Sequence, residues 1–248
     1  MKKLLLSTAS AIVLAQAAGA ADLQLKAPPP LLPPLWTGWY VGLDGGVVHH
    51  DAFFNDLSNV FRTGTFSSNQ TGGFVGVNAG FNWQQGSFVY GIEADWNWVG
   101  AKAGETWGCP LAFCSSLVTS HDVPWIATVR GRAGLAVDAT LFYFTGGLAF
   151  GQVKNSALVF TGPGNGNVLL ASTTENTTRV GWTAGAGVEH MITRNWTVRA
   201  ELRYVDLGRS TRTCVPGGAA LDPDFCAGYR GQFSNSMFKG LVGVDYKF

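Results

Sequence analysis

Apolar and polar residues alternate along most of the chain, in segments of about ten residues. In "WTGWYVGLDGGV", for example, Trp39, Val41 and Leu43 share one parity, while Gly42 and Asp44 share the other. Successive side chains of a β-strand point to opposite faces, so this period predicts strands with one apolar and one polar face. Eight segments carry the pattern and are the expected strands: 36–47, 73–84, 88–99, 125–136, 141–151, 180–191, 196–207 and 236–248.

The connections between these segments alternate between long and short. Three hold only a few residues, and the long ones are 48–72, 100–123, 152–177 and 209–234. Short periplasmic turns and long extracellular loops are typical of outer-membrane barrels. We therefore predict an all-β fold, a closed eight-stranded antiparallel transmembrane β-barrel of the outer-membrane type, over residues 36–248. A soluble β-sandwich would also alternate, but it would lack this rhythm and the gathering of tryptophans near strand ends.

The chain ends inside its last alternating segment, "LVGVDYKF". Val244, Tyr246 and Phe248 share the apolar parity, and Asp245 and Lys247 share the other. A last strand that is paired to its tip fits a closed barrel, because an open edge in lipid would leave backbone groups without hydrogen-bond partners.

Composition supports an exported membrane protein. Charged residues make up 13% of the chain, against about 25% in ordinary soluble domains, and the net charge of +1 gives no reason to expect nucleic-acid binding. Residues 1–20 read as a signal peptide, with two lysines, a short apolar run and cleavage after Ala20. An uncleaved anchor is the alternative, but a span needs about 20 apolar residues. Residues 21–35 are expected to form a proline-rich periplasmic leader.

Three stretches carry a family resemblance: "WIATVRGRAGLAVDATLFYFTGGLAFG", "GWTAGAGVEHMITRNWTVRAELRYVDLG" and "KGLVGVDYKF". They resemble the small outer-membrane β-barrel surface antigens of alphaproteobacteria, often labelled porin family or OmpA-like. The resemblance implies an outer-membrane location and contact with lipid and lipopolysaccharide. It also implies that the outer-membrane assembly machinery reads the terminal signal Val244, Tyr246 and Phe248. We expect a monomer without a cofactor.

Charged side chains of the inward parity are balanced, six acidic against six basic. They are Asp44, Glu93, Asp95, Glu189, Glu201 and Asp245, with Arg130, Arg132, Arg199, Arg203, Lys239 and Lys247. An eight-stranded barrel is only wide enough for side chains to fill it. We therefore expect a salt-bridged interior plug, in which Arg130 and Arg132 pair with Glu93 and Asp95. The alternative is a narrow ion path along the same side chains.

The four cysteines fall into two local pairs. Cys109 and Cys114 lie in the second long connection, and Cys214 and Cys226 lie in the fourth. In an exported protein, local disulfides 109–114 and 214–226 are the expected reading. Zinc binding is the alternative, but no histidine lies within either cysteine frame, so no metal site is expected.

Catalysis finds little support in the sequence. His121 is flanked by Ser120 and Asp122, but adjacent residues point apart and cannot form a triad by adjacency. His49 and His50 could ligate a metal or haem iron, as in some members of the resembled family, although we expect two solvated loop side chains. The predicted role is structural, in envelope integrity and surface presentation. A low-conductance porin-like channel and a surface protein that binds haem or a host molecule are the alternatives.

Overall fold

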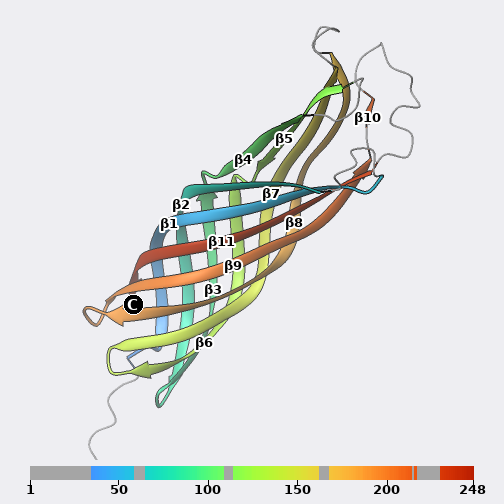
Figure 1. Ribbon diagram of the computed structural model, residues 1–248. Coiled ribbons are helices and arrows are strands. Elements are labelled where there is room, and N and C mark those ends of the chain that lie inside the picture. Colours follow the sequence, from blue (N-terminus) through green and yellow to red (C-terminus); the bar gives the residue numbers. More distant parts are fainter. Residues whose placement is uncertain (1–34, 59–64, 109–113, 162–167, 214, 217–229) are drawn as a thin grey trace, which may run out of the picture. The chain divides into compact units, whose positions relative to one another are not determined.

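The computed structural model describes residues 35–58, 65–108, 114–161, 168–213, 215–216 and 230–248 (Figure 1). The predicted signal peptide with its cleavage site at Ala20, and all of the leader before Leu35, lie outside these residues. The strands are β1 (Gly38–Asp56), β2 (Thr65–Gln85), β3 (Phe88–Val99), β4 (Lys102–Gly108), β5 (Cys114–Asp122), β6 (Trp125–Val137), β7 (Thr140–Thr161), β8 (Leu169–Met191), β9 (Trp196–Thr213), β10 (Val215–Pro216) and β11 (Arg230–Lys247). Across the described ranges, no helix is long and apolar enough to cross a membrane.

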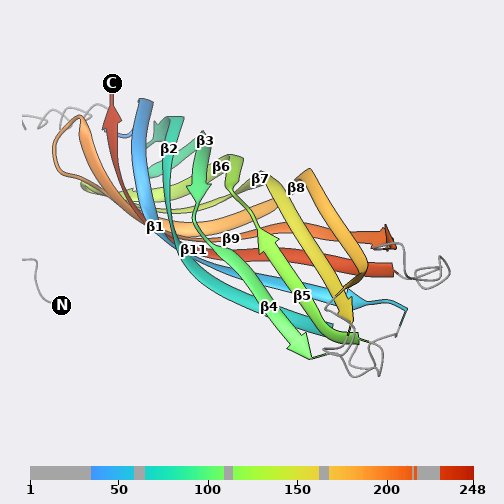
Figure 2. The same cartoon turned by 90° about the horizontal axis from the view of Figure 1, so that it is seen from above.

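Eight of the strands form a closed ring in the order β1-β2-β3-β6-β7-β8-β9-β11 (Figures 1 and 2). All of their pairings are antiparallel, and β11 returns to β1 with Val41 opposite Tyr246. The backbone N–H of Phe248 donates to the carbonyl of Trp39 at 3.0 Å. The last residue is therefore held in the ladder, and the predicted closed eight-stranded antiparallel barrel is confirmed.

The strands run well beyond the predicted segments. β7 has 22 residues and β8 has 23, so the connections expected to be long loops are largely strand. β4 and β5 form a hairpin within the second of these connections, and β5 pairs with β7 beyond the end of the β6–β7 ladder. We call this part of the ring, on the side away from the short turns and from Phe248, the distal extension. It comprises 50–56, 65–72, 102–108, 114–122, 153–161, 169–177, 208–213 and 230–236.

The other part, which we call the proximal half, has the apolar outer face that the alternation predicts. Leu43, Phe144 and Val242 are 67%, 75% and 67% exposed, respectively. Aromatic side chains also lie on this face, and Trp96 stacks on Trp125 with ring centroids 4.5 Å apart. A continuous outer band of this kind is the lipid-facing surface of a transmembrane barrel.

The interior is layered along the barrel, as the inward side chains of β1 illustrate. Asp44 is followed by Val48, then His50, then Phe54, and all four are buried. Each belongs to a different layer, since a strand advances by about 6.6 Å for every second residue. The apolar layers are the proximal one (Trp36, Val89, Leu141, Tyr143, Met191), the central one (Val48, Phe74, Val99, Ala101, Val123, Ile126, Ala149, Val153, Val205, Leu207, Met237, Leu241) and the distal one (Phe54, Phe66, Leu117, Ala157, Val159, Leu170, Ala171, Phe233).

Candidate functional site in the barrel interior

A network of charged side chains occupies the interior between the proximal and central apolar layers. Arg130 of β6 lies beside Glu93 of β3 and is 3.0 Å from Asp95 and 2.7 Å from Glu201. The β3–β6 register places Glu93 opposite Arg130, so alternation brings these two side chains to the same inward face. Glu201 comes from β9, across the lumen, and the guanidinium of Arg130 therefore joins two walls of the barrel.

Arg199 forms a second centre of the network. It is 2.9 Å from Asp44, 2.8 Å from Glu93 and 3.6 Å from Asp245. Its side chain is fully buried, as are those of Arg130 and Arg203. Buried charges of this kind are tolerated only when they are paired, and here each guanidinium has at least two carboxylates.

The two remaining arginines complete the network. Arg132 lies 2.6 Å from Glu189 and 3.6 Å from Glu93, and Arg203 lies 3.0 Å from Asp95 and 2.8 Å from Glu201. Arg132 therefore meets Glu189, not Asp95, most closely. The expected partner, Asp95, lies on the neighbouring strand β3. A long arginine side chain also reaches carboxylates on strands that are not its neighbours, such as Glu189 on β8.

Two tyrosines fill the space between the charges. Tyr40 donates its hydroxyl proton to Glu93 at 2.7 Å, and Tyr143 donates to Glu201 at 2.9 Å. The ring of Tyr40 lies against Gly80, where a Cβ atom would be 2.3 Å from the tyrosine oxygen. Glycine at this inward position therefore leaves the room that the tyrosine ring occupies.

The two lysines predicted in this network have other environments. The Nζ atom of Lys239 is buried and lies 3.8 Å from the centroid of the Phe74 ring, with no hydrogen-bond partner among the described residues. Lys247 donates from Nζ to the backbone carbonyl of Leu35. The prediction that both lysines pair with interior carboxylates is therefore wrong. Lys239 points into the central apolar layer, and Lys247 lies at the proximal mouth beside Leu35.

A second polar layer lies in the distal extension, between the central and distal apolar layers. His50 of β1 is 3.1 Å from the amide oxygen of Asn235, and His121 of β5 is 3.1 Å from that of Asn155. Each histidine N–H donates to its asparagine oxygen. Both rings are almost fully buried, and burial lowers the pKa of His50 and lowers that of His121 to about 4. The two imidazoles are therefore neutral at pH 7.

One carboxylate that contacts this layer, through Asn155, already has several partners. Glu175 of β8 accepts hydrogen bonds from Asn155, Ser210 and Arg212, and its pKa is lowered by them despite partial burial. It also pairs with Arg179 at 3.1 Å. A protonated histidine in this layer would therefore find no unoccupied counter-ion in Glu175.

The prediction of two solvated loop histidines is only half correct. His49 and His50 are successive residues of β1 and therefore point to opposite faces. His49 is exposed, with Nδ1 2.8 Å from the hydroxyl of Thr71, whereas His50 is buried in the interior. The two side chains cannot face one ligand together.

The predicted disulfides lie almost entirely outside the described residues. Cys109, Cys214 and Cys226 lie outside the described residues, and only the backbone of Cys114 is described, at the start of β5. Within the described ranges, no group of three or more histidine, cysteine, aspartate or glutamate side chains could hold a metal ion.

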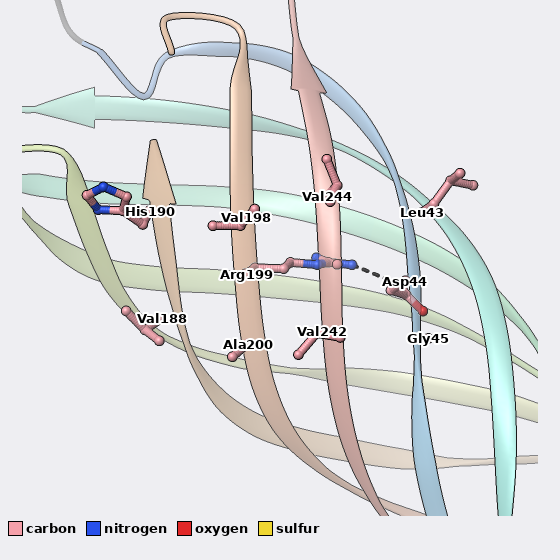
Figure 3. Close-up of a pocket in the computed structure, with 11 residues that line it drawn as sticks. Leu43, Asp44, Gly45, Val188, His190, Val198, Arg199, Ala200, Val242 and Val244 are labelled. Carbon is pink, nitrogen blue, oxygen red and sulfur yellow. Dashed lines mark hydrogen bonds and ion pairs between the residues drawn. The ribbon is translucent and has the colours of Figure 1, made fainter. Parts of the chain in front are cut away.

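The hollow of the outer surface shown in Figure 3 belongs to the lipid-facing side. Its lining consists mostly of small or branched apolar residues, among them Gly45, Val188, Ala200 and Val242. It also includes His190, Asp44 and Arg199. The Arg199–Asp44 pair is drawn behind β11 in the same view, on the interior side of the wall. Arg199 and Asp44 bond to each other at 2.9 Å, so the accessible lining of the hollow is mainly apolar and fits lipid chains better than a polar ligand.

The terminal signal residues lie where the alternation predicts. Val244 and Phe248 are exposed on the outer face, and the ring of Tyr246 contacts both Phe248, at 5.3 Å, and Trp196, at 5.1 Å between centroids. The three side chains form an aromatic and aliphatic edge next to the short β8–β9 turn.

Comparisons with known proteins agree with this architecture. The family model described as "Outer membrane protein beta-barrel domain" matches residues 6–248. A "31 kDa outer-membrane immunogenic protein" of Brucella melitensis is 35% identical, with all of both chains covered. A "22 kDa outer membrane protein" of Rhizobium leguminosarum bv. viciae is 35% identical over 69% of this chain and 64% of its own. The crystal structure of OprG from Pseudomonas aeruginosa matches with a TM-score of 0.48 and 14% identity, covering 86% of this chain and 96% of its own. The chain belongs to the outer membrane protein beta-barrel domain family and is an integral β-barrel protein of the bacterial outer membrane.

Proposed function

We propose that this barrel is closed to ions and solutes. It acts as a scaffold that holds the β-strands of the distal extension outside the cell. It has a structural and surface role in the envelope, as the family does. The observation that carries the proposal is the sequence of layers in the interior. Three apolar layers alternate with two polar ones, and the arginines of the larger polar layer each hold at least two carboxylates.

The central apolar layer is the main barrier in this proposal. Its members come from strands all around the ring, and Val48, Val205 and Met237 are at most 1% exposed. An ion that passed through it would lose its hydration without gaining a polar partner, which costs several kcal/mol or more. Among the described residues, Lys239 is the charged side chain that reaches this layer, and it already lies over the ring of Phe74.

Planar-bilayer recording tests the proposal directly. Purified protein should insert without stepwise conductance. A matched variant, Val48→Ser with Met237→Ser, places hydroxyls in the central layer and should allow detectable conductance if that layer is the barrier. Discrete conductance steps in the unaltered protein would favour the alternative, a low-conductance channel along the charge network.

We further propose that the protein is a monomer that is neither an enzyme nor a nucleic-acid-binding protein, and that lipid and lipopolysaccharide surround it. The relatives are named as outer-membrane immunogenic proteins, which supports a role at the cell surface and suggests no reaction.

Delivery to the membrane is proposed to use the terminal signal Val244, Tyr246 and Phe248. Phe248→Ala should reduce assembly in cells strongly. It should have a small effect on protein refolded in detergent, because burying this side chain contributes at most about 1.5–3 kcal/mol. Heat-modifiable mobility on gels measures the folded fraction of the protein both in cells and after refolding in detergent. Full assembly of the variant in cells would show that Phe248 serves only the lipid-facing surface.

A further inference from the structure

Three residues that precede the first strand are folded into the proximal mouth of the barrel. β1 begins at Gly38, yet Trp36 is only 1% exposed and is, among the described residues, the largest side chain that is fully buried. It belongs to the proximal apolar layer although it is not part of any strand. We call residues 35–37 the mouth segment.

The strands supply a receptor for this tryptophan. Val89 lies next to the β2–β3 turn, Leu141 next to the β6–β7 turn, and Met191 next to the β8–β9 turn. These aliphatic side chains come from three places around the ring, all at the end where the short turns lie. The indole of Trp36 enters the layer from outside the ring of strands and completes it.

The charge network begins directly behind this layer. Tyr143 belongs to the layer, and its hydroxyl donates to Glu201 at 2.9 Å. The guanidinium carbon of Arg132 lies 4.1 Å from the centroid of the same tyrosine ring. One layer of side chains therefore separates the ions from the solvent at the proximal mouth. Water that passed it would weaken the ion pairs, because charges attract less strongly where the dielectric constant is higher.

Side-chain hydrogen bonds hold the mouth segment in place. The N–H of Trp36 donates to Oε1 of Gln84 at 2.9 Å, and the N–H of Gln84 donates to the hydroxyl of Thr37 at 3.0 Å. Nζ of Lys247 donates to the carbonyl of Leu35. The ends of β2 and β11 therefore both hold the segment against the barrel.

Gly38 makes the turn between the mouth segment and β1. Its φ of 138° is a backbone conformation that residues with a side chain rarely adopt. A Cβ atom at this position would lie 3.2 Å from the carbonyl oxygen of Phe248 and 3.3 Å from Cε of Lys247. Glycine therefore permits the turn that directs Trp36 into the mouth.

We propose that the mouth segment is a hinged cap, in which the ring of Trp36 closes the proximal mouth and keeps water away from the charge network. Gly38 is the hinge, and the side chains of Gln84 and Lys247 are the latch. The cap is distinct from the central apolar layer, which is the barrier to ions in the proposed function. Opening the cap exposes the network to water at one end without opening a path through the barrel.

Cysteine labelling in detergent micelles tests the cap. Val89→Cys places a thiol in the proximal layer and Val48→Cys places one in the central layer, both at positions that are at most 1% exposed. A small water-soluble methanethiosulfonate reagent should modify neither thiol, and the unaltered chain, with its own four cysteines, supplies the background. Adding Trp36→Gly should raise the labelling rate at position 89 at least tenfold and leave that at position 48 unchanged. Millimolar indole should restore the protection, because it refills the space of the tryptophan ring.

A matched pair of glycines tests the hinge while the tryptophan is present. Gly38→Ala forces the turn out of its φ region and should raise the labelling rate at position 89 at least fivefold. Gly86 in the β2–β3 turn also has a positive φ, of 61°, but a Cβ atom there would meet nothing within 4 Å. Gly86→Ala should therefore label within twofold of the capped barrel. Heat-modifiable mobility verifies that each variant keeps its barrel.

Three results would overturn the proposal. They are a position 89 that stays protected in an assembled Trp36→Gly variant, equal rises at positions 89 and 48, and equal effects of Gly38→Ala and Gly86→Ala. If Trp36→Gly does not assemble, the two glycine variants decide alone. Labelling does not depend on conductance, so the cap can fail while the barrel remains closed to ions, and the cap can hold in a barrel that conducts.

Discussion

The proximal half and the distal extension are built from the same strands but bury polar groups in different ways. In the proximal half, charges are packed into a network in which Arg130 has three carboxylates. In the distal extension, neutral histidines are held by asparagines, and the buried carboxylate of Glu175 pairs with Arg212, whose side chain is 41% exposed. The comparison teaches that the lumen inside lipid can keep ions that are all buried and paired, whereas the water-exposed part relies on neutral groups, aromatic packing and ion pairs that reach the surface.

Removing one member of the proximal network should have the largest effect. Arg130→Ala leaves three buried carboxylates without that partner, and we expect a loss of about 3–5 kcal/mol in the free energy of unfolding. Urea titration in micelles, followed by gel mobility, measures it. The matched distal variant, Arg212→Ala, breaks a partly exposed pair and should cost at most about 1 kcal/mol. Equal losses would refute the contrast between the two regions.

Truncating the distal aromatic cluster should come next. Phe54 is buried against Phe233, with centroids 5.1 Å apart. Phe54→Ala should cost roughly 3 kcal/mol, because a cavity replaces the ring. The damage should stay local. Limited proteolysis should cut the distal strands faster, while the proximal half keeps its heat-modifiable mobility. Loss of both together would mean that the two regions unfold as one unit.

Acid should weaken the distal extension by a smaller amount. The folded pKa of His121 is about 4, below the ordinary value of 6.5. Between these values the unfolded chain takes up a proton that the folded state excludes, so stability falls as pH falls from about 6.5 toward 4. The loss from this residue should reach about 2 kcal/mol by pH 5. Protease resistance against pH measures it. His121→Gln should flatten the profile, and His49→Gln, at an exposed site, should not.

Reduction of the predicted disulfides should have the smallest effect. If the bridges are 109–114 and 214–226, each closes a short local loop, and the ring itself is held by backbone hydrogen bonds. Gel mobility of the folded protein should therefore be the same with and without a reducing agent. Peptide mapping under non-reducing conditions checks the connectivity, and a 109–214 bridge would contradict it.

Sequence alone was sufficient for the ring and for the parity of its proximal strands. Alternation placed Tyr40 and Asp44 inside and Val41 and Leu43 outside because the contrast in hydrophobicity is strong there. The distal strands escaped detection because their outward residues meet water. Stretches such as 67–71 are polar on both faces, and this is also the composition of loops.

The predicted site was recovered only in part, for a related physical reason. Alternation selects the face on which a side chain lies, and adjacency in the sheet suggests neighbours on that face. It does not determine contacts across the lumen, such as Arg132 with Glu189. His50 was predicted to lie in a loop because the predicted strand ended at residue 47. Lys239 was predicted to pair with a carboxylate because its parity gives the inward face but not the apolar side chains that surround it.

The pairing of β1 with β11 has a consequence for the time course of folding. Tyr40 lies opposite Lys247, so the ladder that completes the ring joins the first and the last strand of the barrel. This ladder closes the largest loop available to the polypeptide, and such non-local contacts slow folding. The ring therefore cannot close until β11 is available to pair with β1. A chain that lost only β11 would leave two unsatisfied edges in lipid, and we expect it to be degraded instead of inserted.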